Sequence, residues 1–211
     1  MKHIVFLRAP DGPVSLQREA LEIFAAPPFD VTVNLVQGGE IDASWHVVIE
    51  AWTDERTLIG CLQRLSPHVA RAVYRVTESV EKDQGPAPGW PVSGVRLIVP
   101  WTGRGDVSAA EQRRHWDEHV PLANRVHVGV TRYVRNWVEC AIGDDAESAP
   151  AYRGIASQHY ASERDLRERS FDSPASVQVI LADVADFIAE PTVLQVVEYR
   201  RAECTDRRPT P

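Results

Sequence analysis

The sequence predicts an α+β fold in which a βαββαβ unit occurs twice in tandem. Two observations indicate it: strand and helix patterns repeat in the same order, and a segment dense in Pro and Gly ("KDQGPAPGWPVSG") separates the two copies. The length of 211 residues suits two units of roughly 100 residues each. This element order is typical of the ferredoxin-like fold, an antiparallel sheet with helices on one face. Because each sheet would leave its other face bare, we expect the two sheets to pack face to face as one barrel of about eight strands.

The first copy shows periodic patterns between turns. Residues 30–36 alternate strictly between apolar and polar side chains, which predicts a strand. Ser15 and Thr53 begin amphipathic runs and are candidate helix N-caps. The predicted elements are strands at 3–9, 30–36, 44–52 and 71–81 and helices at 15–26 and 53–65.

The second copy repeats the order, with one helix interrupted. Ser108 and Glu111 form a capping box, and Pro174 divides a later helical run in two. In the strand at 129–140, alternation places Tyr133 and Asn136 on opposite faces. The predicted elements are strands at 94–101, 129–140, 152–161 and 192–202 and helices at 108–126 and 162–188. We therefore divide the chain into an N-terminal repeat (1–82), a linker (83–93), a C-terminal repeat (94–203) and a tail (204–211).

Composition excludes several classes of function. A net charge of −7 argues against binding to a nucleic-acid backbone, which normally requires a basic face. The three cysteines, Cys61, Cys140 and Cys204, form no C-x-x-C pair, so a reducing compartment is expected. The N-terminus lacks the apolar run of a signal peptide, and no segment approaches the roughly 18 apolar residues that span a bilayer. We expect a cytoplasmic protein.

Residues 115–119 (HWDEH) match the H-x-x-E-H pattern of the inverted zincin proteases. His115 and His119 would share a helical face, as two zinc ligands must, and Glu118 would activate a water. Pro121, however, should end or kink the helix, and no third ligand with its own motif is found. We expect a coincidental match and no bound metal.

Several stretches of the second copy carry a family resemblance: HWDEHVPLA at 115–123, VTRYVRN at 130–136, YRGIASQHYASERDL at 152–166, and ADVADFI with VVEY near the end. They resemble the EthD-like members of the dimeric α+β barrel superfamily. The first copy has the same element order without these motifs. The resemblance implies one dimeric-α+β-barrel-type unit within a single chain, with a ligand between a sheet face and the helices or in the barrel mouth. It also implies chemistry similar to that of cofactor-free isomerases, polyketide cyclases, dehydratases and oxygenases, and some relatives bind haem.

The resemblance also selects candidate site residues. The family's H-x-P-L histidine falls on His119, and its R-Y-x-x-N motif falls on Arg132, Tyr133 and Asn136. A histidine, with an ordinary pKa near ~6.5, exchanges protons near neutral pH, and a tyrosine or amide donor stabilises an oxyanion. We select as catalytic candidates His119, Tyr133, His159 and Asn136, and as substrate-binding candidates His115, Trp116, Arg132 and Trp137.

A structural role is the main alternative for these residues. Trp116 is favoured as a core residue, and His119 as a residue that bonds backbone near a helix end is an equal alternative. Asp183 is favoured as the cap of a helical turn over a catalytic acid. His46 and Glu50, about 13 Å apart on one strand, are too distant for direct contact, and we expect them to face outward or into a polar cavity.

The sequence therefore predicts a cofactor-free lyase or isomerase, of dehydratase or cyclase type, that acts on a small hydrophobic carbonyl-bearing, aromatic or polyketide-like compound. His119 would transfer the proton, and the paired sheets would enclose an apolar hollow that this histidine reaches. One alternative is a cofactor-free or haem-dependent oxygenase of an aromatic substrate, which six tryptophans would suit; another is a ligand-binding module without catalysis. The expected partner is the small organic substrate, with no nucleic acid and no membrane, and homodimer formation stays open.

Overall fold

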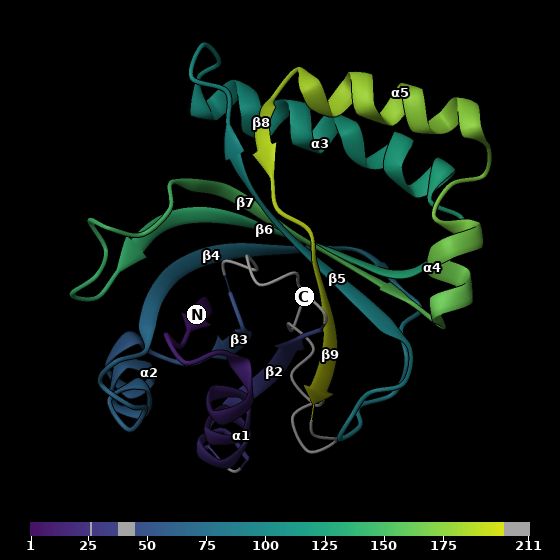
Figure 1. Ribbon diagram of the computed structural model, residues 1–211. Helices are drawn as coiled ribbons and strands as arrows, with labels where there is room; N and C mark the ends of the chain where they lie inside the picture. The colour runs from purple at the N-terminus through teal and green to yellow at the C-terminus, as the bar shows by residue number, and fades with distance from the viewer. Residues whose placement is uncertain (26, 38–44, 201–211) are drawn as a thin grey trace, which may run out of the picture.

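In this computed structural model the chain forms a closed barrel of strands with helices packed on its outside (Figure 1). The structure describes residues 1–25, 27–37 and 45–200. Some of the predicted features lie outside these ranges. They are most of the turn expected before the strand at 44–52, the end residues of three predicted elements (26, 44 and 201–202), and the predicted tail with Cys204.

Each half of the chain contributes strands and helices in the predicted order. The first half contains β1 (Lys2–Arg8), α1 (Pro13–Ile23), β2 (Asp30–Val36), β3 (Val47–Trp52), α2 (Glu55–Leu62) and β4 (Ala70–Asp83). The second half contains β5 (Val95–Gly103), α3 (Ala109–Val126), β6 (Val130–Ile142), β7 (Tyr152–Tyr160), α4 (Glu163–Arg169), α5 (Pro174–Ala185), β8 (Ile188–Pro191) and β9 (Leu194–Arg200).

The barrel closes by pairing strands of the two halves. Going round it, the order is β4–β1–β3–β2–β9–β5–β7–β6, and β6 returns to β4, with every pair antiparallel. Within each half this is the strand order of a ferredoxin-like unit, and the β2–β9 and β4–β6 pairings join the halves. The predicted α+β fold, two βαββαβ repeats packed as one barrel, is confirmed. The residue boundaries given for the repeats and the linker stay a prediction.

The helix starts in the first half differ slightly from those predicted. α1 begins at Pro13, before the expected Ser15 cap, because proline suits the first helical position and Gly12 precedes it with a positive φ of 94°. α2 is capped by Asp54, whose carboxylate accepts a backbone N–H at 2.9 Å, instead of by Thr53.

α3 contains the HWDEHVPLA stretch and has the expected start. Ser108 and Glu111 form the predicted capping box. Of the two effects expected of Pro121, an end or a kink of the helix, the end is wrong, because α3 continues through this proline to Val126. Proline inside a helix costs about 3 kcal/mol. The buried face of α3, which includes residues on both sides of this proline, offsets that cost.

The predicted helical run at 162–188 is two helices followed by a strand. The predicted division of this run at Pro174 is confirmed: α4 ends at Arg169, Ser173 caps α5, and Pro174 takes the first turn of α5. β8 was not predicted. Its four residues carry no alternation signal, and they pair with the end of β5. Tertiary pairing therefore decides this element.

The strands separate an inner layer from two outer ones. Alternate residues of β1 illustrate it: Val5 and Leu7 pack toward α1 and α2, while Ile4 and Phe6 belong to the interior cluster. α3, α4 and α5 lie along the strands of the second half (Figure 1). None of the helices in the described part of the chain combines the length and apolar character that crossing a membrane requires.

Candidate active site

A polar pair of a buried histidine and a half-buried aspartate links α3 to α5. Nδ1 of His119 lies 2.5 Å from Oδ2 of Asp183, and only 6% of His119 is exposed. The other carboxylate oxygen of Asp183 lies 3.6 Å from Nε2 of His115, one helical turn earlier. The sequence-based interpretation of Asp183 as a helix cap is therefore corrected: its side chain connects two helices.

The pairing with Asp183 fixes the protonation state of His119. A carboxylate only accepts hydrogen bonds, so the imidazole proton lies on Nδ1 and Nε2 carries a lone pair. Nε2 has no hydrogen-bond partner among the described residues. Burial lowers the pKa of His119 below its ordinary value of 6.5, and the bond and charge of Asp183 offset this only in part. His119 is thus a neutral base at neutral pH.

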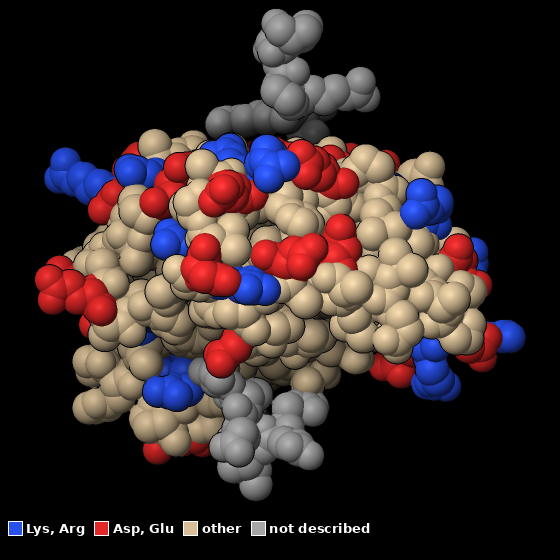
Figure 2. Space-filling model, turned by 90° about the horizontal axis from the view of Figure 1, so that it is seen from above, with Lys and Arg blue, Asp and Glu red and all other residues tan. Residues whose placement is uncertain are grey.

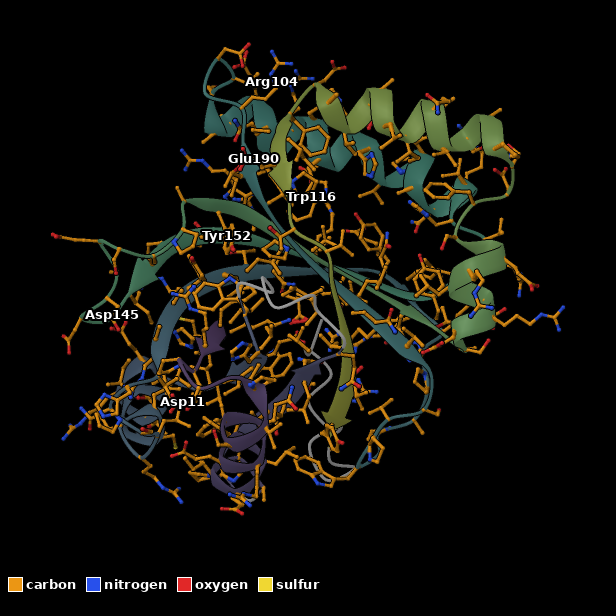
Figure 3. The ribbon with its side chains drawn as sticks, in the orientation of Figure 1. Asp11, Arg104, Trp116, Asp145, Tyr152 and Glu190 are labelled. Atoms are coloured by element: carbon orange, nitrogen blue, oxygen red, sulfur yellow. The ribbon has the colours of Figure 1, made fainter. Side chains whose placement is uncertain are left out.

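A cluster of three aromatic side chains borders His115 and His119 through Phe187. Trp101 of β5 and Trp116 of α3 meet edge to face with ring centroids 5.0 Å apart. Phe187, between α5 and β8, lies 5.5 Å from Trp101 and stacks on His115 at 4.9 Å. Figure 3 shows Trp116 between α3 and the sheet. The predicted core role of Trp116 is correct.

Tyr133 and Trp137 of β6 point to the same side. Tyr133 is buried in a cluster with residues of α3, and burial raises its pKa to about 12, with a hydrogen bond to Trp116 opposing the shift. Its hydroxyl therefore keeps its proton at neutral pH. Trp137 is half-buried, 6.3 Å from Trp116.

Arg135, which the sequence reasoning did not single out, is buried in the same layer. Its guanidinium lies 5.1 Å from the Trp116 ring and bonds Asp117 and Glu81 at 2.7 and 2.8 Å. The two carboxylates hold the guanidinium in place, and the cation–π contact of the guanidinium with the indole fixes the position of Trp116. Alternation along β6 places Arg135 beside Tyr133 and was the available signal.

The H-x-x-E-H pattern does not build a protease centre. Glu118 is exposed and bonds Arg114 at 2.8 Å, away from the face that carries His115 and His119. Within the described ranges, no group of three His, Cys, Asp or Glu side chains is arranged to hold a metal ion.

The sheet separates Asn136 from these residues. Asn136 is fully buried, lines the barrel interior, and donates from Nδ2 to the carbonyl of Ile155 at 3.1 Å. The expectation that Tyr133 and Asn136 face opposite ways is correct. A β-bulge between Val130 and Arg132 shifts the alternation, so Val130 joins the cluster of Tyr133.

His159 and Arg132 lie together at one end of the barrel. His159 has both ring nitrogens bonded, Nε2 to the Ser93 carbonyl and Nδ1 to the Thr131 hydroxyl, each at 2.9 Å. Arg132 is half-buried, with its Nε 3.3 Å from Oδ1 of Asp83. The eight candidates therefore do not form one site: His115, Trp116, His119, Tyr133 and Trp137 face the helices, and Arg132, Asn136 and His159 face the interior.

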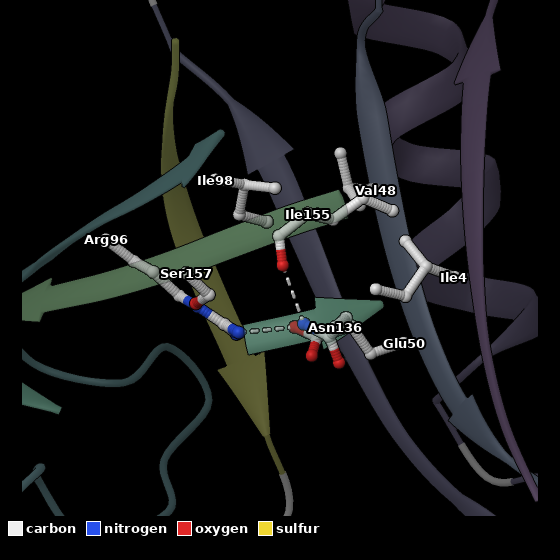
Figure 4. Close-up of a pocket in the computed structure, with 8 residues that line it drawn as sticks. All are labelled: Ile4, Val48, Glu50, Arg96, Ile98, Asn136, Ile155 and Ser157. Atoms are coloured by element: carbon white, nitrogen blue, oxygen red, sulfur yellow. Dashed lines mark hydrogen bonds and ion pairs between the residues drawn. The ribbon is translucent and has the colours of Figure 1, made fainter. Parts of the chain in front are cut away.

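The barrel interior corrects the expectation of an apolar hollow. Its centre is a network of buried charges in which Arg96 bonds Glu50 at 2.6 Å and Ser157 at 2.6 Å (Figure 4). Lys2 also bonds Glu50, at 2.8 Å. The space between these side chains amounts to about 170 Å³, none of it wide enough for a water molecule. His119 does not line it. The predicted polar cavity for Glu50 is correct, whereas His46 accepts the Ala9 N–H at 3.2 Å.

Besides Arg135, three residues on the helix side of the sheet were not identified as site residues from the sequence. Asp183 was read as a cap, and Phe187 and Trp101 were not selected at all. The signal for two of them was present, because the ADVADFI stretch that supports the family resemblance contains both Asp183 and Phe187. Trp101 carries no local signal.

Comparisons with known proteins agree with this architecture. The EthD domain model matches residues 104–191, which include α3, β6, β7, α4 and α5. No curated protein matches the sequence.

Several solved structures share the fold. An anthrone oxidase-like protein superposes with a TM-score of 0.61 at 12% identity, covering 96% of this chain and 94% of its own. A proposed monooxygenase from Fusobacterium nucleatum gives 0.54 at 9% identity, covering 94% of this chain and 91% of its own. Another proposed monooxygenase, from Lactobacillus acidophilus, superposes with a TM-score of 0.53 at 9% identity, covering 93% of this chain and 92% of its own. Residues 104–191 therefore match the EthD domain model, and the chain shares its α+β barrel fold with these solved structures.

Proposed function

We propose that the protein is an enzyme that removes a proton from carbon next to a carbonyl in a small hydrophobic compound, with His119 as the base. The observation that carries this is the hydrogen bond from His119 Nδ1–H to Asp183. It leaves Nε2 as the basic atom and stabilises the imidazolium that forms when a proton arrives. The fold neighbours with enzyme-like names support catalysis in general, not this reaction.

The proton transfer balances without a further reactant. Nε2 of His119 takes the proton, the C–H electron pair forms a carbon–carbon double bond, and the carbonyl π pair moves to oxygen. Return of the proton to another carbon gives an isomer. Transfer to a hydroxyl leaving from the β-carbon releases water, so dehydration and isomerisation share the first step. Tyr133, which keeps its proton, is the proposed donor to the oxyanion.

A second candidate is an oxygenase that forms the same carbanion and passes electrons to dioxygen. The aromatic wall of Trp101, Trp116 and Phe187 supports an aromatic substrate. The names of two kinds of fold neighbour, anthrone oxidase-like and proposed monooxygenase, favour it as well.

Some relatives bind haem, and this site offers a histidine that could ligate the haem iron but otherwise does not fit the group. A histidine that donates Nδ1–H to a carboxylate is suited to bind iron through Nε2. The buried rings of Trp101, Trp116 and Phe187 fill the space beside it, however, and leave no room for a macrocycle. Haem therefore does not fit this site, and we expect no Soret band of bound haem when haemin is added to the protein.

Deuterium exchange tests the proposed proton transfer before the product is known. Aromatic and β-dicarbonyl ketones are incubated with the protein in D₂O, and exchange at the carbon next to the carbonyl is followed by NMR. We expect His119→Gln to reduce the exchange rate by about 10²–10⁴-fold.

His127→Gln is the matched control. His127 is also partly buried, with a pKa lowered by burial and a bond to a backbone carbonyl at 2.6 Å, but it lies at the end of α3 and outside the aromatic wall. Equal exchange in the His119 variant and the wild type would exclude the proposal. Oxygen consumption with the same ketones separates the oxygenase from the isomerase.

A further inference from the structure

Phe187 occupies the centre of the candidate site. Its ring is fully buried, stacks on His115 at an interplanar angle of 28°, and lies 6.0 Å from His119. On another side it meets Trp101 nearly perpendicularly, at 85° and 5.5 Å. A flat aromatic ring thus already fits between the histidines and the indole.

Trp101 next to it has an unused hydrogen-bond donor. Its indole Nε1 is enclosed, and no acceptor lies within reach among the described residues. Other indoles of this chain are satisfied: Trp45 donates to the Tyr152 hydroxyl and Trp52 to Glu78, each at 3.1 Å. A buried indole N–H normally finds a partner, so the missing acceptor needs an explanation.

The two indoles are fixed by the backbone of β7. Gly154 leaves room for both, since a Cβ there would lie 2.5 Å from ring atoms of Trp101 and of Trp116. The backbone of β7 therefore restricts movement of the two indoles toward the strand. Because the buried ring of Phe187 fills the space between Trp101 and His115, a ligand ring at this position has to displace Phe187.

The segment that carries Phe187 pairs with the barrel over only a short stretch. It joins α5 to β8, and β8 pairs with β5 at Trp101, Thr102 and Gly103 alone. β9 pairs separately with β5 and β2, so the barrel stays closed if β8 and Phe187 move. Two backbone hydrogen bonds, of 3.2 and 3.1 Å, hold Phe187 itself.

We propose that Phe187 stands in the place of the substrate ring, and that an aromatic ring bearing a carbonyl or phenolic oxygen displaces it and accepts the Trp101 N–H. This rests on the proposed function for the position of the ring beside His119. It narrows the substrate to planar aromatic compounds with an oxygen on or next to the ring. It also makes Trp101, in addition to Tyr133, a donor to that oxygen.

Phe187→Ala tests the proposal with phenol and benzene as size-matched probes. We expect this variant to bind phenol about threefold to tenfold more tightly than benzene, the effect of one net hydrogen bond. In ¹⁵N–¹H spectra the Trp101 indole resonance, assigned by its loss in Trp101→Phe, should move downfield with phenol and not with benzene. Trp101→Phe combined with Phe187→Ala should remove the preference.

Phe24→Ala is the matched control, because Phe24 is equally buried but lies in the core under α1. Equal affinity of Phe187→Ala for the two probes, or a phenol preference also in Phe24→Ala, would overturn the proposal. Phe187→Leu replaces Phe187→Ala if that variant does not fold. Failure of this proposal can be told apart from failure of the proposed function. Phenol binding is measured without turnover, and the effect of His119→Gln on deuterium exchange is measured without phenol.

Discussion

The environment of each histidine decides its role in this protein. His119, His127 and His159 are all largely buried, yet His127 bonds a backbone carbonyl and His159 uses both ring nitrogens within the structure. Only His119 is paired with a carboxylate in a way that leaves Nε2 free to accept a proton. One residue type therefore gives two structural side chains and one candidate base.

Asp183→Asn should change the pH dependence of His119. Burial lowers the pKa of His119, and Asp183 raises it, so loss of the carboxylate lowers this pKa further. We expect the acidic limb of kcat/KM, which lies below pH 6.5 in the wild type, to move to still lower pH. An asparagine can also donate to Nδ1 and reverse the tautomer, so the maximal rate should fall. Deuterium exchange measured from pH 4 to 8 checks both effects; an unchanged profile would contradict the pairing.

At the level of elements, α3 and β7 fit together through a glycine. Gly154 faces α3 and lets Trp101 and Trp116 lie against the strand. The sequence predicts both elements from capping and alternation. It does not reveal that this glycine is a packing requirement, because the two indoles come from positions far away along the chain.

Gly154→Ala should destabilise the protein. The added methyl group would overlap both indoles, and overpacking of this kind costs about 1–3 kcal/mol. Urea unfolding followed by tryptophan fluorescence measures the loss. Gly60→Ala is the control, since Gly60 lies inside α2 with open space around it and should gain about 0.5–1 kcal/mol. If Gly154→Ala leaves the free energy of unfolding unchanged, the indoles of Trp101 and Trp116 can move away from β7, which would contradict this packing requirement.

At the level of the whole molecule, a charge network crosses the barrel interior and joins the halves. Glu50 of β3 belongs to the first half, and Arg96 of β5 and Glu198 of β9 belong to the second. Burial alone raises the pKa of Glu50, but Arg96 and Lys2 outweigh it and hold that pKa far below 4.5.

Arg96→Met should therefore cost about 3–5 kcal/mol, because it leaves buried carboxylates without their cation. Adding Glu50→Met should recover part of the loss in urea unfolding, since the unpaired charge is then absent. The exposed pair of Arg114 and Glu118 provides the comparison: Arg114→Ala should cost at most about 0.5 kcal/mol. Similar losses in the two single variants would contradict a role for the network in stability.

Stability should fall as the pH drops below 6.5. Burial is the first cause that lowers the pKa of five histidines, so the unfolded chain takes up these protons first and unfolding becomes easier. Above pH 6.5 their contribution is complete. Carboxylates such as Glu50, whose pKa is lowered, extend the loss to pH values below 4.5. Urea midpoints at pH 8, 7, 6 and 5 measure the trend, and equal midpoints at pH 7 and 5 would contradict it. The histidines concerned are His3, His46, His119, His127 and His159.

The sequence by itself determined the repeat of βαββαβ units, the closed barrel and the family motif around His119. These follow from local periodicity, from caps such as Ser108 with Glu111, and from the need to bury two bare sheet faces. Only the tertiary structure decided that Asp183 pairs with His119, that Phe187 fills the space beside it, and that the barrel interior is charged. Such contacts join side chains far apart along the chain, and they depend on which helix covers which strand. Periodicity within a single element carries no information about that choice.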